Sequence, residues 1–476
     1  MNVAFVGSWF VEHLKVQNAC EERLKIWYLI RHKKNQTQRS SLLNRSILRL
    51  AIPNIISNLS VPLLGAVDTA LVGHLDDVAY IGALAIGSVI FNFIFWGFGF
   101  LRMGTTGLTA QEYGRRDRKE MMMILARVQL IAMGIGLTIL FLQNPIALLS
   151  LWMIESTADV GKYTRIYFDI RIYTAPAVLA LYGINGWFLG MQNAAYPMIV
   201  TITHNLLNIV LNVLFIYGFG MHVDGVAYGT LISTYIALVL AFALYFKKYS
   251  RYLSHFVRKD LLNTRRLREY FTVNRDIFIR TLCLIFTFSF FTAVSSAQGE
   301  IILAANTILL QYWFIVSYGI DGFAYAAESL VGRFKGAGNF DKLKKSVVYT
   351  TSWGLLIGLT GTLVYGLLGN NLLYLFTDKI EVISHAETVL FWTILAPVIS
   401  AFCYILDGVF IGATKTGPMR NTMLISTFAV FLPAYYLLTD FFGVHGLWLA
   451  MLLFMLSRGV ALGFYLPGTI LNKSTA

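Results

Sequence analysis

The chain has 476 residues, of which 57% are hydrophobic and only 13% are charged. Soluble domains carry about 25% charged residues, so this composition excludes an ordinary soluble domain and indicates a membrane protein. The net charge of +13 does not require a nucleic-acid partner, because basic residues collect in the cytoplasmic loops of membrane proteins. The three cysteines, Cys20, Cys283 and Cys403, indicate neither a disulfide framework nor a metal site.

Twelve stretches are long and apolar enough to cross a bilayer as helices, which takes about 20 residues each. In chain order they are 48–73, 80–105, 121–143, 165–190, 196–218, 225–246, 275–297, 302–331, 346–368, 386–412, 419–440 and 446–467. The sequence therefore predicts an all-α integral membrane protein with twelve transmembrane helices. We interpret the polar residues 1–45 as a cytoplasmic leader, with an over-extended reading frame as the alternative.

The loops between these spans alternate in charge. Most of the 38 lysines and arginines lie before the first span, after every second span and in the tail. The other loops hold acidic residues, namely Asp76, Asp77, Glu155, Asp159, Asp224, Glu300 and Asp378. The positive-inside rule then places both termini in the cytoplasm. We expect a multi-pass protein of the inner (cytoplasmic) cell membrane.

The chain repeats itself at an offset of 222 residues. Gly186 and Gly190 match Gly408 and Gly412, and the string NGWFLG resembles DGVFIG. Six spans in each half is an even number, so the halves share one topology and a pseudo-two-fold axis along the membrane normal. The predicted organisation is a leader (1–45), an N-terminal six-helix lobe (46–246), a basic cytoplasmic linker (247–274), a C-terminal six-helix lobe (275–467) and a cytoplasmic tail (468–476).

Two six-helix lobes that face one another are typical of a secondary transporter. The sequence has no GxxxxGK[ST] phosphate-binding loop, so we do not expect ATP to drive it directly. The alternative is a duplicated membrane protein that does not transport, such as a scaffold, a receptor or a membrane enzyme. An enzyme would need a nucleophile–base pair or a metal site in the spans, and His204 alone is neither. We expect no enzyme activity, catalytic residue, metal or cofactor.

Ionisable side chains within the spans are candidates for function, because each costs roughly 2.5–3.5 kcal/mol at the centre of a membrane helix. They are Asp68, Arg102, Arg127, Arg280, Asp321, Glu328, Asp407 and Arg458. Asp68 lies about 27 Å of helical rise beyond Leu50, in the outer half of its span. Pro62 precedes it and allows the helix to bend. A carboxylate there suits a protonation switch, and the alternative is a structural ion pair with Arg102.

The fifth span carries four polar side chains on one face. Thr201, Asn205, Asn208 and Asn212 follow one another in steps of four, three and four residues, which keeps them on one side of a helix. A single asparagine is commonly an interhelical contact. Three asparagines on one face indicate the lining of a polar cavity at least as strongly as they indicate contacts between helices.

In the second half, Asp321 and Glu328 are seven residues apart and share one helical face. Arg280, in the preceding span, is a candidate partner for one of them. Asp407 lies close to the inner end of its span, where we expect it to cap or to pair at the cytoplasmic gate.

Four other charges have simpler interpretations. We expect Arg127 and Arg458 to face the lobe interiors or to extend to the membrane surface. Asp169 and Arg171, in the string FDIRIY, are expected to form an ion pair near the outer surface.

Five strings resemble the DinF branch of the MATE (multidrug and toxic compound extrusion) family: AVDTALVGHL, FLRMGTTGLTAQEYG, NRDIFIRTL, DGFAYAAES and LDGVFIGATKTGPMRNTM. The resemblance runs from about residue 45 to residue 467. It implies a twelve-helix, two-lobe antiporter that exports mostly cationic or amphipathic compounds, with inward flow of H⁺ or Na⁺ as the energy source.

The resemblance also implies roles for individual residues. Asp68 falls on the coupling carboxylate of the N-terminal lobe, Asn208 and Asn212 fall on a pair in the fifth helix, and Thr230 falls on a hydroxyl of the sixth helix in the same network. Proton-coupled relatives often carry an acid at the second position of that pair. Asn212 therefore leaves Asp68 as the main titratable group of this lobe.

Sodium-coupled relatives rely on acids in the seventh and tenth helices. Here the seventh span has no acid at mid-membrane depth, and Asp407 lies nearer the cytoplasm than the family site. Asp321 and Glu328 are possible substitutes. The resemblance therefore favours H⁺ over Na⁺ and leaves Na⁺ open.

We predict a proton-coupled multidrug efflux antiporter, monomeric, surrounded by membrane lipids, with a drug-like or organic-cation substrate and no nucleic-acid partner. The candidate residues of the second lobe and of the substrate site are Asp321, Glu328, Arg280, Asp407 and Asn205. A lipid-linked saccharide flippase is the alternative transporter. It would need a basic cavity for pyrophosphate, and only Arg102 and Arg280 are placed for that, against four acids.

Overall fold

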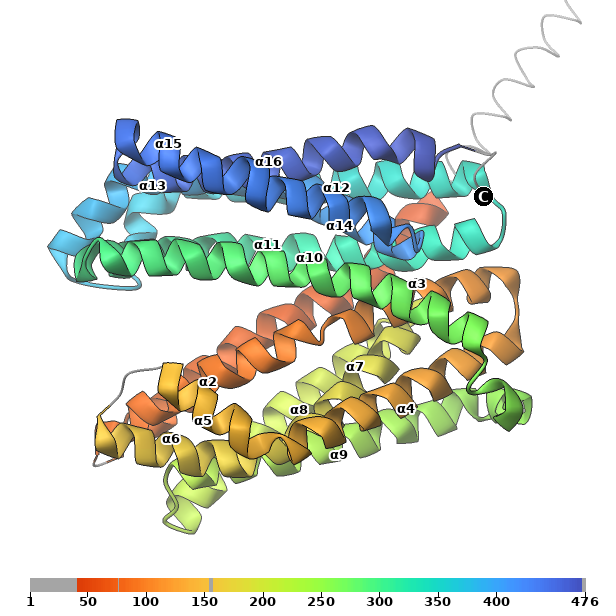
Figure 1. Ribbon diagram of the computed structural model, residues 1–476, viewed down its shortest axis with the longest axis horizontal. Helices are drawn as coiled ribbons and strands as arrows, with labels where there is room; N and C mark the ends of the chain where they lie inside the picture. The colour runs from red at the N-terminus through yellow and green to blue at the C-terminus, as the bar shows by residue number, and fades with distance from the viewer. Residues whose placement is uncertain (1–40, 76, 154–156, 473–476) are drawn as a thin grey trace, which may run out of the picture. The chain divides into compact units, whose positions relative to one another are not determined.

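The structure, a computed structural model, describes residues 41–75, 77–153 and 157–472, and most of that part of the chain is helical (Figure 1). The contacts divide the chain into residues 1–48 and residues 49–476, and all packing described below lies within the second unit. The predictions for residues 1–40, for Asp76 and Glu155, and for residues 473–476 of the tail fall outside the described residues.

All twelve predicted spans are confirmed as helices long and apolar enough to cross a membrane. They are Ser41–Val72, Ala79–Arg115, Arg118–Phe141, Ala158–Gly190, Ala195–Gly218, Val223–His255, Thr264–Ala297, Glu300–Gly336, Phe340–Leu373, Ile380–Gly412, Thr416–Phe442 and Val444–Thr469. Several run further than predicted on the side of the basic loops, which we call the basic end of each lobe. The protein is therefore a multi-pass membrane protein.

Figure 1 labels the α-helices one by one, so a span that is interrupted carries more than one label. They are α2 (Ala79–Gly97), α3 (Phe100–Arg115), α4 (Arg118–Phe141), α5 (Gln143–Met153), α6 (Ala158–Arg171), α7 (Ala175–Gly190), α8 (Ala195–Val213), α9 (Val223–Tyr249), α10 (Thr264–Ala297), α11 (Glu300–Gly336), α12 (Phe340–Leu373), α13 (Ile380–Gly412), α14 (Thr416–Ile425), α15 (Leu432–Phe442) and α16 (Val444–Thr469). Two of the interruptions are π-helical turns, Leu214–Gly218 and Ser426–Phe431.

The 222-residue repeat is visible in the backbone. Arg116 and Gly338 follow α3 and α11, and both are left-handed, with φ of 63° and 64°. The next residues, Asp117 and Asn339, cap α4 and α12 by accepting a backbone hydrogen bond three residues later. Each pair differs by 222 residues. The two lobes therefore have the same helix-ending and helix-starting geometry as well as the same topology.

Helix crossings repeat at the same offset. The backbone of Arg102 on α3 lies where a side chain of Gly186 on α7 would begin, and Ala324 on α11 lies in the same relation to Gly408 on α13. Small residues let membrane helices approach closely and gain van der Waals contact. This accounts for the glycines that reveal the repeat in the sequence.

The lobes meet at their basic ends, where α3 of the first lobe packs along α11 of the second (Figure 1). Gly114 lies against the backbone of Arg333, and Gly336 lies against the backbone of Gln111. The Gln111 side chain donates a hydrogen bond from Nε2 to the carbonyl of Gly412 (3.1 Å). The basic ends are thus joined by direct backbone packing.

The basic linker is attached to the first lobe by a buried arginine. Arg127 on α4 is 3% exposed. Its Nη1 donates to Glu120 (2.6 Å), and its Nη2 donates to the carbonyl of Asp260 in the linker (2.9 Å). The expectation that Arg127 faces the interior is confirmed.

Candidate functional site

Asp68, in the outer half of the first span, is joined to the fifth and sixth spans by a chain of hydrogen bonds. Asn212 Nδ2 on α8 donates to Asp68 Oδ1 (2.7 Å) and to Asn208 Oδ1 (3.0 Å). Asn208 Nδ2 donates to Thr230 Oγ1 on α9 (3.0 Å). Both asparagines are fully buried. The structure thus brings together the four residues that the family resemblance groups into one network.

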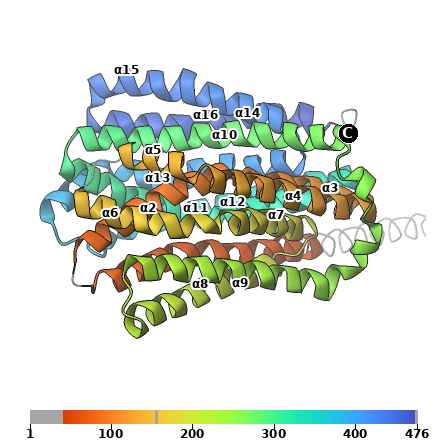
Figure 2. The same ribbon diagram turned by 60° about the horizontal axis from the view of Figure 1, so that its bottom comes forward.

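The sequence of α8 and α9 explains this arrangement. The asparagines share one helical face, and Figures 1 and 2 both show α8 beside α9. Gly229 on α9 leaves the space that the Asn212 carbonyl oxygen occupies. That Oδ1 atom is buried and accepts no hydrogen bond from the described residues. The Asn212 side chain thus donates to Asp68 through Nδ2, while its Oδ1 is an acceptor without a partner among the described residues.

The polar network extends further than the sequence indicated. Asn205 Nδ2 donates to Ser60 Oγ on the first helix (2.8 Å), and the ring of His204 bridges Asn205 Oδ1 and Thr234 Oγ1, each at 3.2 Å. Ser60 precedes Asp68 by eight residues, slightly more than two turns, so both lie on similar faces. That spacing is the sequence signal that could have identified Ser60.

The guanidinium of Arg171 on α6 interacts electrostatically with the Asp68 carboxylate. The Arg171 guanidinium donates to the Tyr167 hydroxyl and lies 4.9 Å from the centroid of the Phe91 ring. It is therefore held beside the network without forming a direct ion pair with Asp68.

The ion pair between Asp68 and Arg102, the alternative to a protonation switch, does not form. Arg102 lies next to Glu328 instead, with 3.6 Å between Nη1 and Oε2. Span 2 is interrupted at residues 98–99, and Arg102 follows this break on α3, the segment that packs against α11. Asp68 lies in the opposite half of its span. The two charges therefore differ in depth and in the neighbour that they face.

The predicted ion pair between Asp169 and Arg171 is wrong. Asp169 accepts from Arg165 Nε at 2.9 Å. Residues two apart on a helix point in nearly opposite directions, whereas residues four apart are neighbours on one face.

The second lobe holds a different charge cluster. Asp407 on α13 accepts from Arg280 on α10 and from Arg458 Nη2 on α16 (2.7 Å) through the same oxygen, Oδ2. All three are buried, with exposed fractions of 4%, 8% and 1%. The expectation that Arg280 pairs with Asp321 or Glu328 is wrong, because its ion pair is with Asp407. The expectations that Asp407 pairs and that Arg458 faces the interior are confirmed.

Asp321 and Glu328 both lie on α11, the helix that meets the first lobe. Glu328 is 1% exposed. Its neighbour Arg102 stacks over the Tyr325 ring, with 4.0 Å from the guanidinium carbon to the ring centroid. Both Nη atoms of Arg102 are buried without a hydrogen-bond partner among the described residues. Asp321 lies within electrostatic range of Arg102 and Arg280 and forms no ion pair in the described part of the chain.

A cavity of about 320 Å³ lies in the first lobe, with Tyr325 of the second lobe in its wall. It is lined by Asn54, Ser57, Asn58, Trp96, Gly99, Arg102, Met103, Tyr182, Asn185, Leu189, Pro197, Thr201 and Tyr325. Its walls combine aromatic rings, a thioether, neutral polar groups and one guanidinium, that of Arg102. Aromatic faces attract organic cations, and methionine adapts to irregular apolar ligands.

The family model MatE matches residues 53–214 and 277–437. The DNA damage-inducible protein F of Escherichia coli (strain K12) is 36% identical over 423 residues, which cover 88% of this chain and 91% of that protein. The Multidrug export protein MepA of Staphylococcus aureus (strain bovine RF122 / ET3-1) is 22% identical, with 86% and 90% covered.

Solved structures share the fold. The Vibrio cholerae MATE transporter VcmN in the bent form has a TM-score of 0.81 at 20% identity, with 89% of this chain and 96% of that chain covered. A MOP superfamily transporter from Pyrococcus furiosus has a TM-score of 0.80 at 21% identity, with 89% and 95% covered. The twelve-helix fold in two lobes is that of these transporters. Because the family model matches a long segment in each half and more than half of the chain in total, the chain belongs to the MatE family of membrane transporters.

Proposed function

We propose that this protein is a proton-coupled antiporter that exports cationic or amphipathic organic molecules from the cytoplasm. The observation that carries the proposal is the hydrogen-bonded chain from Asp68 through Asn212 and Asn208 to Thr230. It contains a single carboxylate and connects three helices. A change of its protonation state therefore reaches all three.

Protonation of Asp68 changes the hydrogen bond between Asp68 and Asn212. An ionised carboxylate only accepts hydrogen bonds, whereas a protonated one also donates. In the ionised state Asp68 accepts from Asn212 Nδ2. In the protonated state the carboxyl donates to Asn212 Oδ1, the buried acceptor that has no other partner among the described residues. Turning the amide alone would break the hydrogen bond from Nδ2 to Asn208, so we expect protonation to move α8 relative to the first helix.

Both helices that hold this bond can bend close to it. Pro62 lacks the N–H that the carbonyl of Asn58 would otherwise receive, which weakens the first helix before Asp68. The π-helical turn Leu214–Gly218 begins two residues after Asn212, and such turns are frequent at functional sites. The proton site therefore lies between two weak points, which suits a coupling role.

The cavity beside Tyr325 supports a cationic substrate. Trp96, Tyr182 and Tyr325 present aromatic rings to it, and Glu328 supplies a negative charge beside Tyr325. The guanidinium of Arg102 already stacks on Tyr325. A planar organic cation with the same charge and a similar shape fits the same environment.

The direction of transport follows from the charged loops and the lobe contacts. The positive-inside rule assigns the basic ends and both termini to the cytoplasm of a cell with an inner membrane. Backbone packing holds these ends together in this structure, so we assign it to the state closed toward the cytoplasm. A proton then reaches Asp68 from outside, and a substrate leaves the cavity to the outside.

The other candidate mechanisms are less well supported. Sodium binding in the second lobe would need several free carboxylates, but among its three candidates only Asp321 is without an ion pair in the described part of the chain, since Asp407 is bound by two arginines and Glu328 lies beside a third. A flippase for pyrophosphate-linked lipids would need several free cations in the cavity. Arg280 is bound to Asp407, and Arg102 faces Glu328. The proton and the organic cation remain the proposed pair.

Transport into everted vesicles tests the coupling. Ethidium uptake driven by an imposed pH step, acid inside, is expected to fall at least tenfold in Asp68→Asn, while the melting temperature of the purified variant stays within a few degrees. Asp159→Asn is the matched control, because Asp159 is exposed in the first turn of α6, and it should transport normally. Proton-driven uptake retained by Asp68→Asn, or uptake by the parent driven by a Na⁺ gradient alone, would overturn the proposal.

A further inference from the structure

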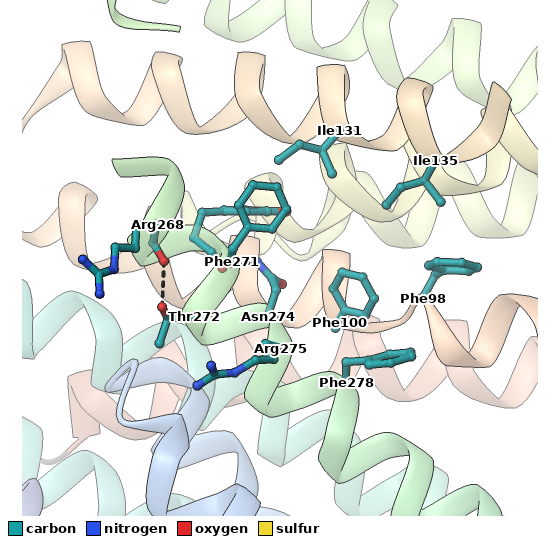
Figure 3. Close-up of a pocket in the computed structure, with 11 residues that line it drawn as sticks. Phe98, Phe100, Ile131, Ile135, Arg268, Phe271, Thr272, Asn274, Arg275 and Phe278 are labelled. Carbon is teal, nitrogen blue, oxygen red and sulfur yellow. Dashed lines mark hydrogen bonds between the residues drawn. The ribbon is translucent and has the colours of Figure 1, made fainter. Parts of the chain in front are cut away.

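A groove of about 640 Å³, separate from the proposed substrate cavity, lies between α10 of the second lobe and α3 and α4 of the first (Figure 3). None of its lining residues lines the cavity described above. Its two ends differ in chemistry. One end carries arginines and the other is formed by aromatic and aliphatic side chains.

The polar end is formed by Arg268 and Arg275, seven residues apart on one face of α10 (Figure 3). Arg268 is exposed and forms no ion pair with the described residues. Arg275 is 59% exposed, and its Nη2 lies 3.2 Å from Asp276, which also accepts from Arg420. No acidic residue lines the groove. This end therefore carries an excess of positive charge that favours an anion.

The apolar end lies deeper in the membrane. Phe98, Ile131, Ile135 and Phe278 come from three helices and surround it (Figure 3). Ten residues separate Arg268 from Phe278, which is about 15 Å of helical rise. The groove thus passes from exposed arginines to apolar side chains along α10.

A further polar atom in the wall lacks a partner. Asn274 lines the groove between its two ends and is 2% exposed. Its Nδ2 donates to the carbonyl of Tyr270 (2.8 Å), while its Oδ1 is buried and accepts no hydrogen bond from the described residues. Buried acceptors are normally satisfied. The Oδ1 atom lies where a side chain of Gly104 on α3 would begin, so Asn274 closes the inner wall of the groove.

We propose that this groove binds an anionic phospholipid of the phosphatidylglycerol type from the leaflet at the basic end. The phosphodiester lies between Arg268 and Arg275, and an acyl chain packs against Phe278 and Ile135. Because the walls belong to both lobes, the bound lipid holds α4 and α10 at their present separation. The proposal concerns binding alone and does not depend on the transported ion or substrate.

Lipid retention by the purified full-length protein tests the assignment. The protein is incorporated into nanodiscs of equal phosphatidylglycerol and phosphatidylcholine, extracted in mild detergent and analysed by native mass spectrometry. The parent should retain phosphatidylglycerol in preference to phosphatidylcholine. The double variant Arg268→Ala/Arg275→Ala should retain at least fivefold less. The control Arg258→Ala/Arg265→Ala removes the same charge from exposed positions outside the groove and should behave like the parent.

A second variant tests the acyl-chain end without changing charge. Ile131→Trp fills the groove and should lower phosphatidylglycerol retention while leaving the melting temperature in phosphatidylcholine unchanged. Inorganic phosphate and glycerol 3-phosphate serve as probes of a headgroup-only site and should not raise the melting temperature at millimolar concentration. Equal losses in the two double variants, full retention in Ile131→Trp, or stabilisation by free phosphate would each overturn the proposal.

Discussion

The two lobes share a backbone plan but hold their buried carboxylates in opposite ways. In the first lobe, Asp68 accepts a hydrogen bond from a neutral amide, Asn212, within a chain of uncharged groups. In the second, Asp407 is bound by two arginines, Arg280 and Arg458. The duplication preserved helix crossings and caps, while the polar interior diverged. Under the proposed function, the first lobe holds a site that can change charge, whereas the second holds a cluster fixed by two arginines.

The energetics of the two arrangements explain why only one can switch. A hydrogen bond from an amide to a carboxylate contributes about 1.5–3 kcal/mol to stability, so a proton and a small helix movement can replace it. Removing one partner of a buried ion pair costs about 3–5 kcal/mol, because an uncompensated charge stays behind. We expect the first lobe to respond to pH and the second to provide a stable frame.

The largest expected effect comes from breaking the fixed cluster. Asp407→Ala leaves two buried arginines without their carboxylate and should destabilise the protein by about 3–5 kcal/mol. Thermal melting of the detergent-solubilised protein and its yield after size-exclusion chromatography measure this. Asp378→Ala, at an exposed acid, is the control and should melt like the parent. An unchanged melting temperature for Asp407→Ala would contradict the fixed role of the second lobe.

An intermediate effect should come from adding an acid to the first lobe. Asn212→Asp places two carboxylates within hydrogen-bond distance, where they share protons rather than ionise together. The number of protons exchanged per substrate should rise from about one toward two, as measured by parallel proton and ethidium fluxes in proteoliposomes. Asn144→Asp, at an exposed position, should leave the ratio at the parental value. An unchanged ratio for Asn212→Asp would separate this position from coupling.

The smallest expected effect concerns the contact between the lobes. Arg102→Gln removes the guanidinium that stacks on Tyr325 and faces Glu328, and it leaves that acid available to a bound cation. Affinity for tetraphenylphosphonium should increase three- to tenfold, which corresponds to about 0.7–1.4 kcal/mol. Isothermal titration measures it, with Arg165→Gln as the control. Weaker binding by Arg102→Gln would show that the arginine forms part of the site.

Much of the fold could be predicted from the sequence, because span length, loop charge and the 222-residue repeat are properties of the chain itself. The neighbours of Asp68 could be predicted in part, since the amides of α8 follow a helical period. Their contact with Asp68 came from the family resemblance, not from that period.

Ion pairs between spans were predicted poorly. Arg102 and Arg280 have several acids within reach in sequence, and the choice among them depends on helix rotation, tilt and depth. The break at residues 98–99 turns Arg102 toward α11 and away from Asp68. Gly97 and Gly99 flank that break and were the signal in the sequence that could have located it. Only the pair Asp169–Arg171 could have been rejected on spacing alone.

The backbone packing at the basic ends has a consequence for how the lobes separate. Gly114 and Gly336 place main chain directly on main chain, so of the contacts described at this seam only the side-chain hydrogen bond from Gln111 to Gly412 must break when it opens. We expect separation there to be a rigid-body movement of one lobe relative to the other. A methyl group at either glycine would act as a wedge. It would shift the population toward the conformation that is open to the cytoplasm without touching the proton site.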